Sequence, residues 1–269
     1  MVLQSAQTRR LLLLTGLAAL LGVLGGCAAW VLLHLIGLIT NVALFHQFGW
    51  HPPSFSELDA GPMLFVAAVL GAVVISVLAK WSPVIRGHGI PEAMEAVLTK
   101  QSRIAPRTAV AKPLSAAIAI GTGAPFGAEG PIIVTGGSLG SLIGQVVRVS
   151  PAERKILLAA GAAAGMAATF GAPLAAVVLA IELLLFEFST RAFVPLVVAS
   201  SIAGGMHSLL FGAGPLFKVP PHNYAGLRVL PRSSCSGSAP DCSQCSSAAG
   251  CSRSRVGTGV CRCASSGTP

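Results

Sequence analysis

Two short segments hold the residues whose types and spacing could do chemistry, and each places glycines before a proline that opens a predicted helix. The segments are Gly87-His88-Gly89-Ile90-Pro91-Glu92 and Gly127-Ala128-Glu129-Gly130-Pro131-Ile132. The N–H groups of a helix's first turn lack intrahelical partners, and the helix dipole adds partial positive charge there. Two such helix starts together would bind a small anion without a full positive charge to trap it. The candidate anion ligands are therefore Gly87, His88, Gly89, Ile90 and Pro91 from the first segment, and Gly127, Gly130, Pro131 and Ile132 from the second.

Glu129 is the one charged residue in a long apolar stretch. The residues from Pro113 to Ala128 and from Gly130 to Val147 carry no charge. A carboxylate at membrane depth costs about 3 kcal/mol or more unless it has a function or a partner. We therefore expect Glu129 to act on the anion, and the alternative is a neutral acid that caps the helix beginning at Pro131.

The composition indicates a membrane protein. Of 269 residues, 53% are hydrophobic and 10% are charged, which leaves too few charges for the surface of a soluble enzyme. The net charge is +9, but the lysines and arginines lie between apolar runs and form no basic helix of the kind that binds nucleic acid. We expect an all-α polytopic membrane protein that is not an enzyme and needs no cofactor or metal, with the lipid bilayer as its partner. The uncharged runs are 11–56, 61–79, 113–128, 130–147, 156–181 and 192–217.

The first apolar stretch, Leu11 to Phe45, is longer than a membrane span. As one straight helix it would extend about 50 Å, so it must tilt strongly or break near Gly25 and Gly26. A second interpretation is a lipoprotein signal ending at Cys27. Because the residues after Cys27 stay apolar, we favour an uncleaved span with Cys27 as a small core residue.

The loops predict the orientation of the chain. Arg9 and Arg10 precede the first span, the 46–62 loop has no lysine or arginine, and 80–112 contains six basic residues. By the positive-inside rule, the amino terminus and the 80–112 region are cytoplasmic. We expect a multi-pass protein of the cell membrane.

The ordered motifs resemble those of the CLC family of chloride channels and chloride-proton antiporters. The two glycine–proline segments are followed by Gly161-Ala-Ala-Ala-Gly165, Gly171-Ala172-Pro173-Leu174-Ala175 and Ile181-Glu182, in the family's order and at similar intervals. The resemblance covers about residues 11–231. It implies a homodimer whose subunits contain two inverted halves with tilted and broken helices. This chain resembles the amino-terminal half, so the second half would have to be supplied in cis or in trans.

The resemblance also assigns roles to single residues. Glu129 resembles the gating glutamate, whose carboxylate occupies an anion position when charged and leaves it when protonated or displaced by chloride. The segment 87–91 resembles the inner chloride-coordinating loop, with His88 where the family usually has serine. A histidine there could donate an N–H group to the anion, titrate, or face the vestibule.

A further departure from the family concerns proton coupling. Family members that exchange chloride for protons usually carry a second glutamate after the Ile-Glu pair, and the matching residue here is Leu183. Leucine cannot relay a proton, so the proton-relay position is lost. The resemblance therefore implies channel-like anion conduction, while Glu182 is expected to cap or pack.

The sequence changes character after Pro231. Residues 232–269 are rich in Ser, Gly, Cys and Arg, which predicts a disordered tail beside a membrane domain of residues 1–231. Translation in a shifted frame would account for this tail, and a genuine tail is the alternative. The cysteine spacing lacks the paired knuckle of a zinc site. We expect chloride transport that is incomplete in this fragment. The alternative is a truncated membrane fragment or assembly subunit that does not transport.

Overall fold

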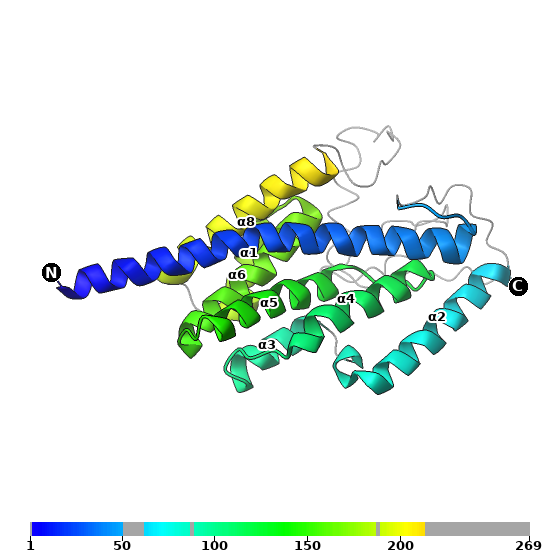
Figure 1. Cartoon of the computed structure of the whole chain (residues 1–269), viewed down its shortest axis with the longest axis horizontal. Helices are drawn as coiled ribbons and strands as arrows, with labels where there is room; N and C mark the ends of the chain where they lie inside the picture. Colours follow the sequence, from blue (N-terminus) through cyan, green and yellow to red (C-terminus); the bar gives the residue numbers. More distant parts are fainter. Residues whose placement is uncertain (1, 51–61, 87–88, 187–188, 213–269) are drawn as a thin grey trace, which may run out of the picture. The chain divides into compact units, whose positions relative to one another are not determined.

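The computed structural model describes residues 2–50, 62–86, 89–186 and 189–212, and these are helical with no strand. This confirms the predicted all-α fold (Figure 1). The domain boundary predicted at Pro231 and the cysteine-rich tail lie outside the described residues. The helices are α1 (Val2–Thr40), α2 (Pro62–Trp81), α3 (Ile90–Thr99), α4 (Pro106–Gly121), α5 (Glu129–Val146), α6 (Pro151–Phe170), α7 (Pro173–Ala180) and α8 (Thr190–Phe211), with π-helical turns η1 (Asn41–Phe45) and η4 (Ile181–Leu185) and a 3₁₀ turn η3 (Pro83–Arg86).

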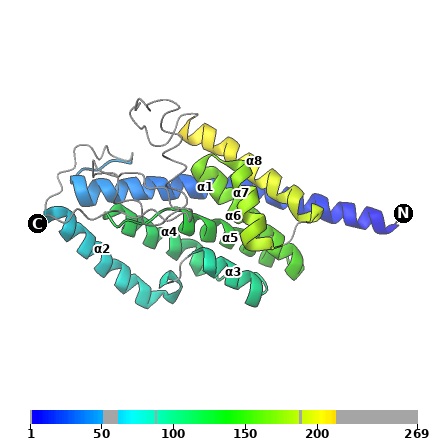
Figure 2. The same ribbon diagram turned by 180° about the vertical axis from the view of Figure 1, so that it is seen from behind.

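Helix α6 forms the centre of the helical unit. It packs against α1, α5 and α8, and Figures 1 and 2 both show it between α8 and α5. Its residues from Leu157 to Thr169 are buried. Small side chains dominate this helix. The backbones of the three neighbouring helices can therefore approach its backbone closely.

The closest of these contacts joins α5 to α6. A Cβ atom added to Gly161 would collide with the carbonyl oxygen of Gly136, and one added to Gly136 would collide with the carbonyl oxygen of Gly161. One turn further along α5, Gly140 meets the carbonyl of Leu157 in the same way. Only glycine fits at these positions, so the spacing of glycines fixes how the two helices face each other.

Of the two alternatives expected for the first helix, a strong tilt or a break, the break is not observed. Helix α1 runs through 39 residues, about 58 Å, without interruption near Gly25 or Gly26. Both glycines instead allow close packing, Gly25 against Ala164 of α6 and Gly26 against Met206 of α8. The expectation that Cys27 lies in the core is also wrong, because this side chain is exposed.

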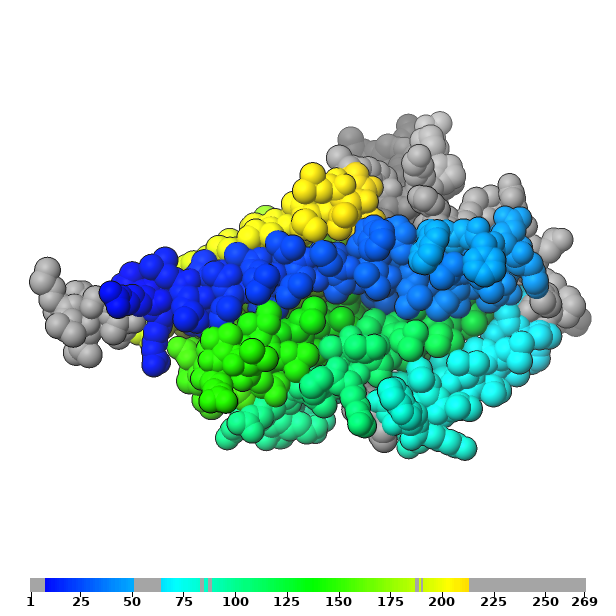
Figure 3. Space-filling model, in the orientation of Figure 1, coloured from blue at the N-terminus to red at the C-terminus, as the bar shows by residue number. Residues whose placement is uncertain are grey.

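Three helices among the described residues are long and apolar enough to cross a membrane. They are Thr8–Phe45, Leu64–Trp81 and Arg191–Phe211. Their outer faces carry large exposed apolar side chains, and the long blue helix α1 lies across the face shown in Figure 3. Exposed apolar surface of this extent is typical of a multi-pass membrane protein whose helices contact lipid or further helices.

Candidate anion site

The first predicted segment ends in a bend that only glycine adopts without strain. Gly89 has φ of 80° and is the N-cap of α3, which begins at Ile90 and carries Pro91 in its first turn. The first intrahelical bond of this segment runs from the N–H of Ala93 to the carbonyl of Gly89, at 3.1 Å. The N–H group of Ile90 lies before that bond and has no intrahelical acceptor. Gly87 and His88 lie outside the described residues.

The second predicted segment also begins a helix without a side-chain cap. Ala128 is the N-cap of α5, Glu129 is its first residue, and Gly130 and Pro131 follow. The N–H of Ile132 already donates to the carbonyl of Ala128 at 3.0 Å, and the Ile132 side chain is fully buried. The donors in this turn without an intrahelical acceptor are therefore the N–H groups of Glu129 and Gly130, since Pro131 has none.

The side chain of Glu129 is exposed at this helix start. Its carboxylate makes no hydrogen bond or ion pair with the residues that the structure describes. The capping alternative would require the carboxylate to accept a bond from a first-turn N–H group, and no such bond is present between described residues. Gly127 lies just before this helix and is exposed as well.

The two helix starts meet through their backbones. A Cβ atom added to Gly89 would lie 2.8 Å from the Cα and 3.0 Å from the carbonyl oxygen of Gly130. The structure therefore brings Gly89, directly before Ile90 and Pro91, against Gly130, directly before Pro131. Glu129 precedes Gly130 directly, so a carboxylate stands beside the paired positive ends of two helix dipoles.

A buried ion pair holds the start of α3 in place, and the sequence did not reveal it. Lys112 was counted among the basic residues of a cytoplasmic loop, but it lies inside α4 and is 5% exposed. Its Nζ atom lies 2.8 Å from Oε2 of Glu92 and donates to the carbonyl of Ile85 at 3.3 Å. The only sequence signal was the position of Lys112 directly before the apolar run that begins at Pro113.

The predicted proton-relay position lies on the π-helical turn η4. Leu183 is half-buried, and the neighbouring Glu182 is exposed and caps no helix. Lys155 of α6 donates from Nζ to the carbonyl of Leu185 at 2.7 Å, which fixes the end of this turn. The residue at the proton-relay position itself is a leucine, which carries no titratable group.

Comparison with known proteins finds relatives among chloride channels and exchangers. A family model described as "Voltage gated chloride channel" matches residues 70–233. The chain is 32% identical over 217 residues to the "H(+)/Cl(-) exchange transporter ClcA" of Salmonella arizonae, covering 76% of this chain and 43% of that protein. It is 30% identical over 156 residues to a "Putative chloride channel protein ClcB-like" of Ralstonia nicotianae, covering 56% of this chain and 36% of that protein.

A solved structure shows the same fold. The crystal structure of a slow cyanobacterial Cl⁻/H⁺ antiporter matches with a TM-score of 0.59 at 24% identity, covering 83% of this chain and 52% of that one. The chain thus spans less than half the length of the two curated relatives. The family model spans most of the described helices, from α2 to α8. On these grounds the chain belongs to the voltage-gated chloride channel family.

Proposed function

We propose that this chain forms the amino-terminal half of a pathway that carries chloride across the membrane, gated by Glu129. The observation that carries the proposal is the backbone contact between Gly89 and Gly130. It places the uncapped starts of α3 and α5 side by side, and helix starts of this kind bind anions through N–H groups and dipoles. The names of the relatives support chloride as the anion.

Glu129 would gate this pathway by competing with the anion for the same donors. A carboxylate at the first residue of α5 carries the same charge as chloride and reaches the same helix start. When the carboxylate is protonated, it loses the charge that the helix dipole attracts, so the position becomes free for an anion. The exposed side chain has room to move between these positions.

Conduction through this pathway would be channel-like. Tight exchange of chloride for protons needs a titratable group on the second side of the pathway, and Leu183 cannot bind a proton. Glu182 is next to it but exposed, on the outer surface of η4. A passive anion pathway requires only that binding be weak enough for the ion to leave.

The described residues supply only part of such a site. A chloride ion that leaves water needs several donors in place of its hydration shell, and the two helix starts offer few free N–H groups. We propose that a second half, in cis or in trans, supplies the remaining donors and covers Glu129, with the complete protein forming a homodimer.

Chloride efflux from liposomes tests this proposal. The 269-residue chain should give no anion-selective efflux above empty liposomes by itself. Co-expression with the carboxy-terminal half of a ClcA exchanger should restore efflux that is selective for anions. Anion-selective efflux from the chain alone that loses its pH dependence in Glu129→Gln would contradict the need for a second half. A stable complex of the two halves without any efflux would instead support the alternative of a non-transporting assembly subunit.

A further inference from the structure

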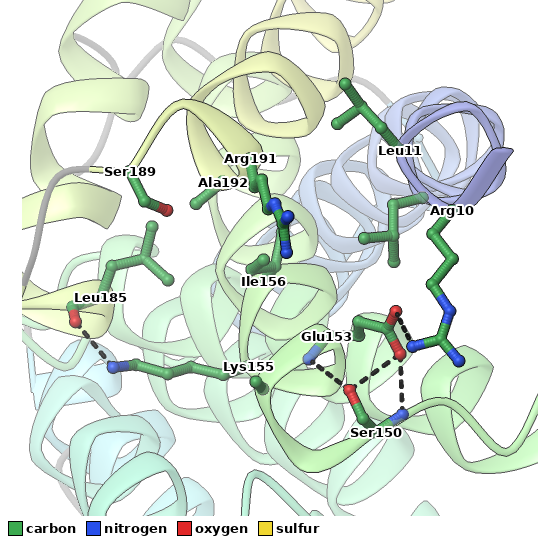
Figure 4. A pocket seen from close by; sticks show the side chains of 12 residues that line it. Arg10, Leu11, Ser150, Glu153, Lys155, Ile156, Leu185, Ser189, Arg191 and Ala192 are labelled. Carbon is green, nitrogen blue, oxygen red and sulfur yellow. Dashed lines mark hydrogen bonds and ion pairs between the residues drawn. The ribbon is translucent and has the colours of Figure 1, made fainter. Parts of the chain in front are cut away.

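A cavity away from the paired helix starts lies where α6 and α8 begin, beside residues 10–14 of α1. It has a volume of about 320 Å³, and Figure 4 shows its lining residues. Arg10 comes from the start of the apolar part of α1, Lys155 from α6, and Arg191 from the first turn of α8. None of these residues takes part in the proposed anion pathway.

The cavity carries an excess of positive charge. Three basic side chains and one carboxylate, that of Glu153, line it. This carboxylate is already occupied, because it accepts hydrogen bonds from the N–H and Oγ of Ser150 at 2.9 and 2.8 Å and lies 3.6 Å from Nη1 of Arg10. Burial raises the pKa of Glu153, but the bonds from Ser150 and the charge of Arg10 outweigh it and hold the pKa below its usual range. Glu153 therefore stays ionised and engaged with Ser150 and Arg10.

Arg191, which also lines this cavity, makes no hydrogen bond or ion pair with any residue that the structure describes. Figure 4 shows it over Ile156 with no interaction drawn to any other lining residue. Arg191 is the second residue of α8, where the helix dipole disfavours a positive charge. Ser189 precedes the helix and forms no side-chain cap, so first-turn N–H groups of α8 also face this end. An anion in the cavity would stabilise both the guanidinium and the helix start.

The other residues that line the cavity indicate an amphiphilic ligand at the membrane surface. About half of the lining residues are apolar, namely Leu11, Leu14, Ala152, Ile156, Leu185 and Ala192. Two of the candidate spans, Thr8–Phe45 and Arg191–Phe211, begin beside the cavity. The cavity therefore combines phosphate-binding groups with hydrocarbon surface at the level where a span enters the bilayer.

We propose that this cavity binds the phosphate group of an anionic phospholipid through Arg191, with Arg10 and the start of α8 as further contacts. The guanidinium of Arg191 would form charge-assisted hydrogen bonds to the phosphate oxygens, as arginine does with planar or tetrahedral oxyanions. Leu11 and Leu14 would contact the glycerol end of the acyl chains. This site is independent of chloride transport and of Glu129.

Native mass spectrometry of the purified 269-residue chain tests this proposal. Phosphatidylglycerol should be retained in preference to phosphatidylcholine, and Arg191→Gln should weaken its apparent affinity about tenfold, the effect of one lost charge-assisted hydrogen bond. Arg191→Lys should weaken it less, because the charge remains. Arg107→Gln is the matched control, since Arg107 is also an exposed second residue of a helix, α4, but does not line the cavity.

Four results would overturn the proposal. Equal loss of lipid in the Arg107 and Arg191 variants would mean that surface charge alone attracts the lipid. Unchanged retention in Arg191→Gln would mean that the lipid binds elsewhere. Retention of phosphatidylcholine equal to that of phosphatidylglycerol would show that the negative charge of the lipid plays no role in binding. Displacement of phosphatidylglycerol by millimolar inorganic phosphate would identify the ligand as a soluble phosphate. Arg191 is exposed, so these substitutions should leave the fold intact, which circular dichroism checks.

Discussion

Charged residues in apolar surroundings carried the most information about single positions in this chain. Glu129 stands out in the sequence as a candidate site residue because no other charge lies between Pro113 and Val147, and its role stays a prediction. Lys112 was misassigned because the positive-inside rule counts basic residues in a segment without knowing where a helix begins. Its partner, Glu92, comes from a different helix, and pairing across helices depends on packing that the sequence pattern does not contain.

Leu183 leads to a prediction about protons. In liposomes that contain a transport-competent assembly of this chain, a chloride gradient should not drive proton uptake, because no carboxylate occupies this position. A pH-sensitive dye outside the liposomes measures the uptake, and an H⁺/Cl⁻ exchanger of the ClcA type is the positive control. Stoichiometric uphill proton movement through this assembly would show that the relay uses another residue.

The sequence pattern predicts where α3 and α5 begin, but it does not predict how these helices pack. Glycine before proline predicted the starts of α3 and α5, because each residue has a specific backbone preference. The contact between Gly89 and Gly130 could not be predicted, since it depends on how α3 lies against α5. A break near Gly25 was considered but does not occur. The absence of a Cβ atom at Gly25 instead lets α1 pack closely against α6, and the helix continues.

The ion pair between Lys112 and Glu92 should be important for the stability of α3 and α4. Lys112→Met leaves the carboxylate of Glu92, which is 23% exposed, without its partner. Removing one partner of a fully buried pair typically costs about 3 kcal/mol, and the partial exposure of Glu92 should make the loss smaller, about 1 to 2 kcal/mol. Unfolding in mixed detergent micelles measures the loss. The control is Lys100→Met, which removes an exposed pair with Glu95 and should change stability by about 0.5 kcal/mol or less. Equal effects of the two substitutions would contradict a structural role for Lys112.

The contact between α5 and α6 gives a second stability prediction. Gly161→Ala adds a methyl group where the carbonyl of Gly136 already lies, so it should destabilise the fold by about 1 to 3 kcal/mol. Gly205→Ala is the matched control because nothing lies within 4 Å of its added methyl group. That control should be neutral or slightly stabilising, since alanine favours a helix. The same unfolding assay compares both, and a neutral Gly161 variant would mean that the helices are not in close contact.

The whole described unit has the fold of its relatives but matches only part of their length. Apolar faces on α1 and α2 and the exposed Glu129 are surfaces that lipid or further helices would cover. The composition predicted the membrane class, because 10% charged residues cannot cover a water-facing surface. The packing of α6 at the centre could not be predicted, since small residues in α1, α5, α6 and α8 are equally compatible with several arrangements.

The pH dependence of chloride efflux tests the central claim most directly. The assay uses liposomes that contain this chain together with a complementary second half. Glu129→Gln should abolish most of the pH dependence, because an amide mimics a permanently protonated carboxyl group. Glu182→Gln, a change of an exposed carboxylate outside the paired helix starts, should leave the pH profile unchanged. An unaltered pH profile in Glu129→Gln would contradict gating by this residue.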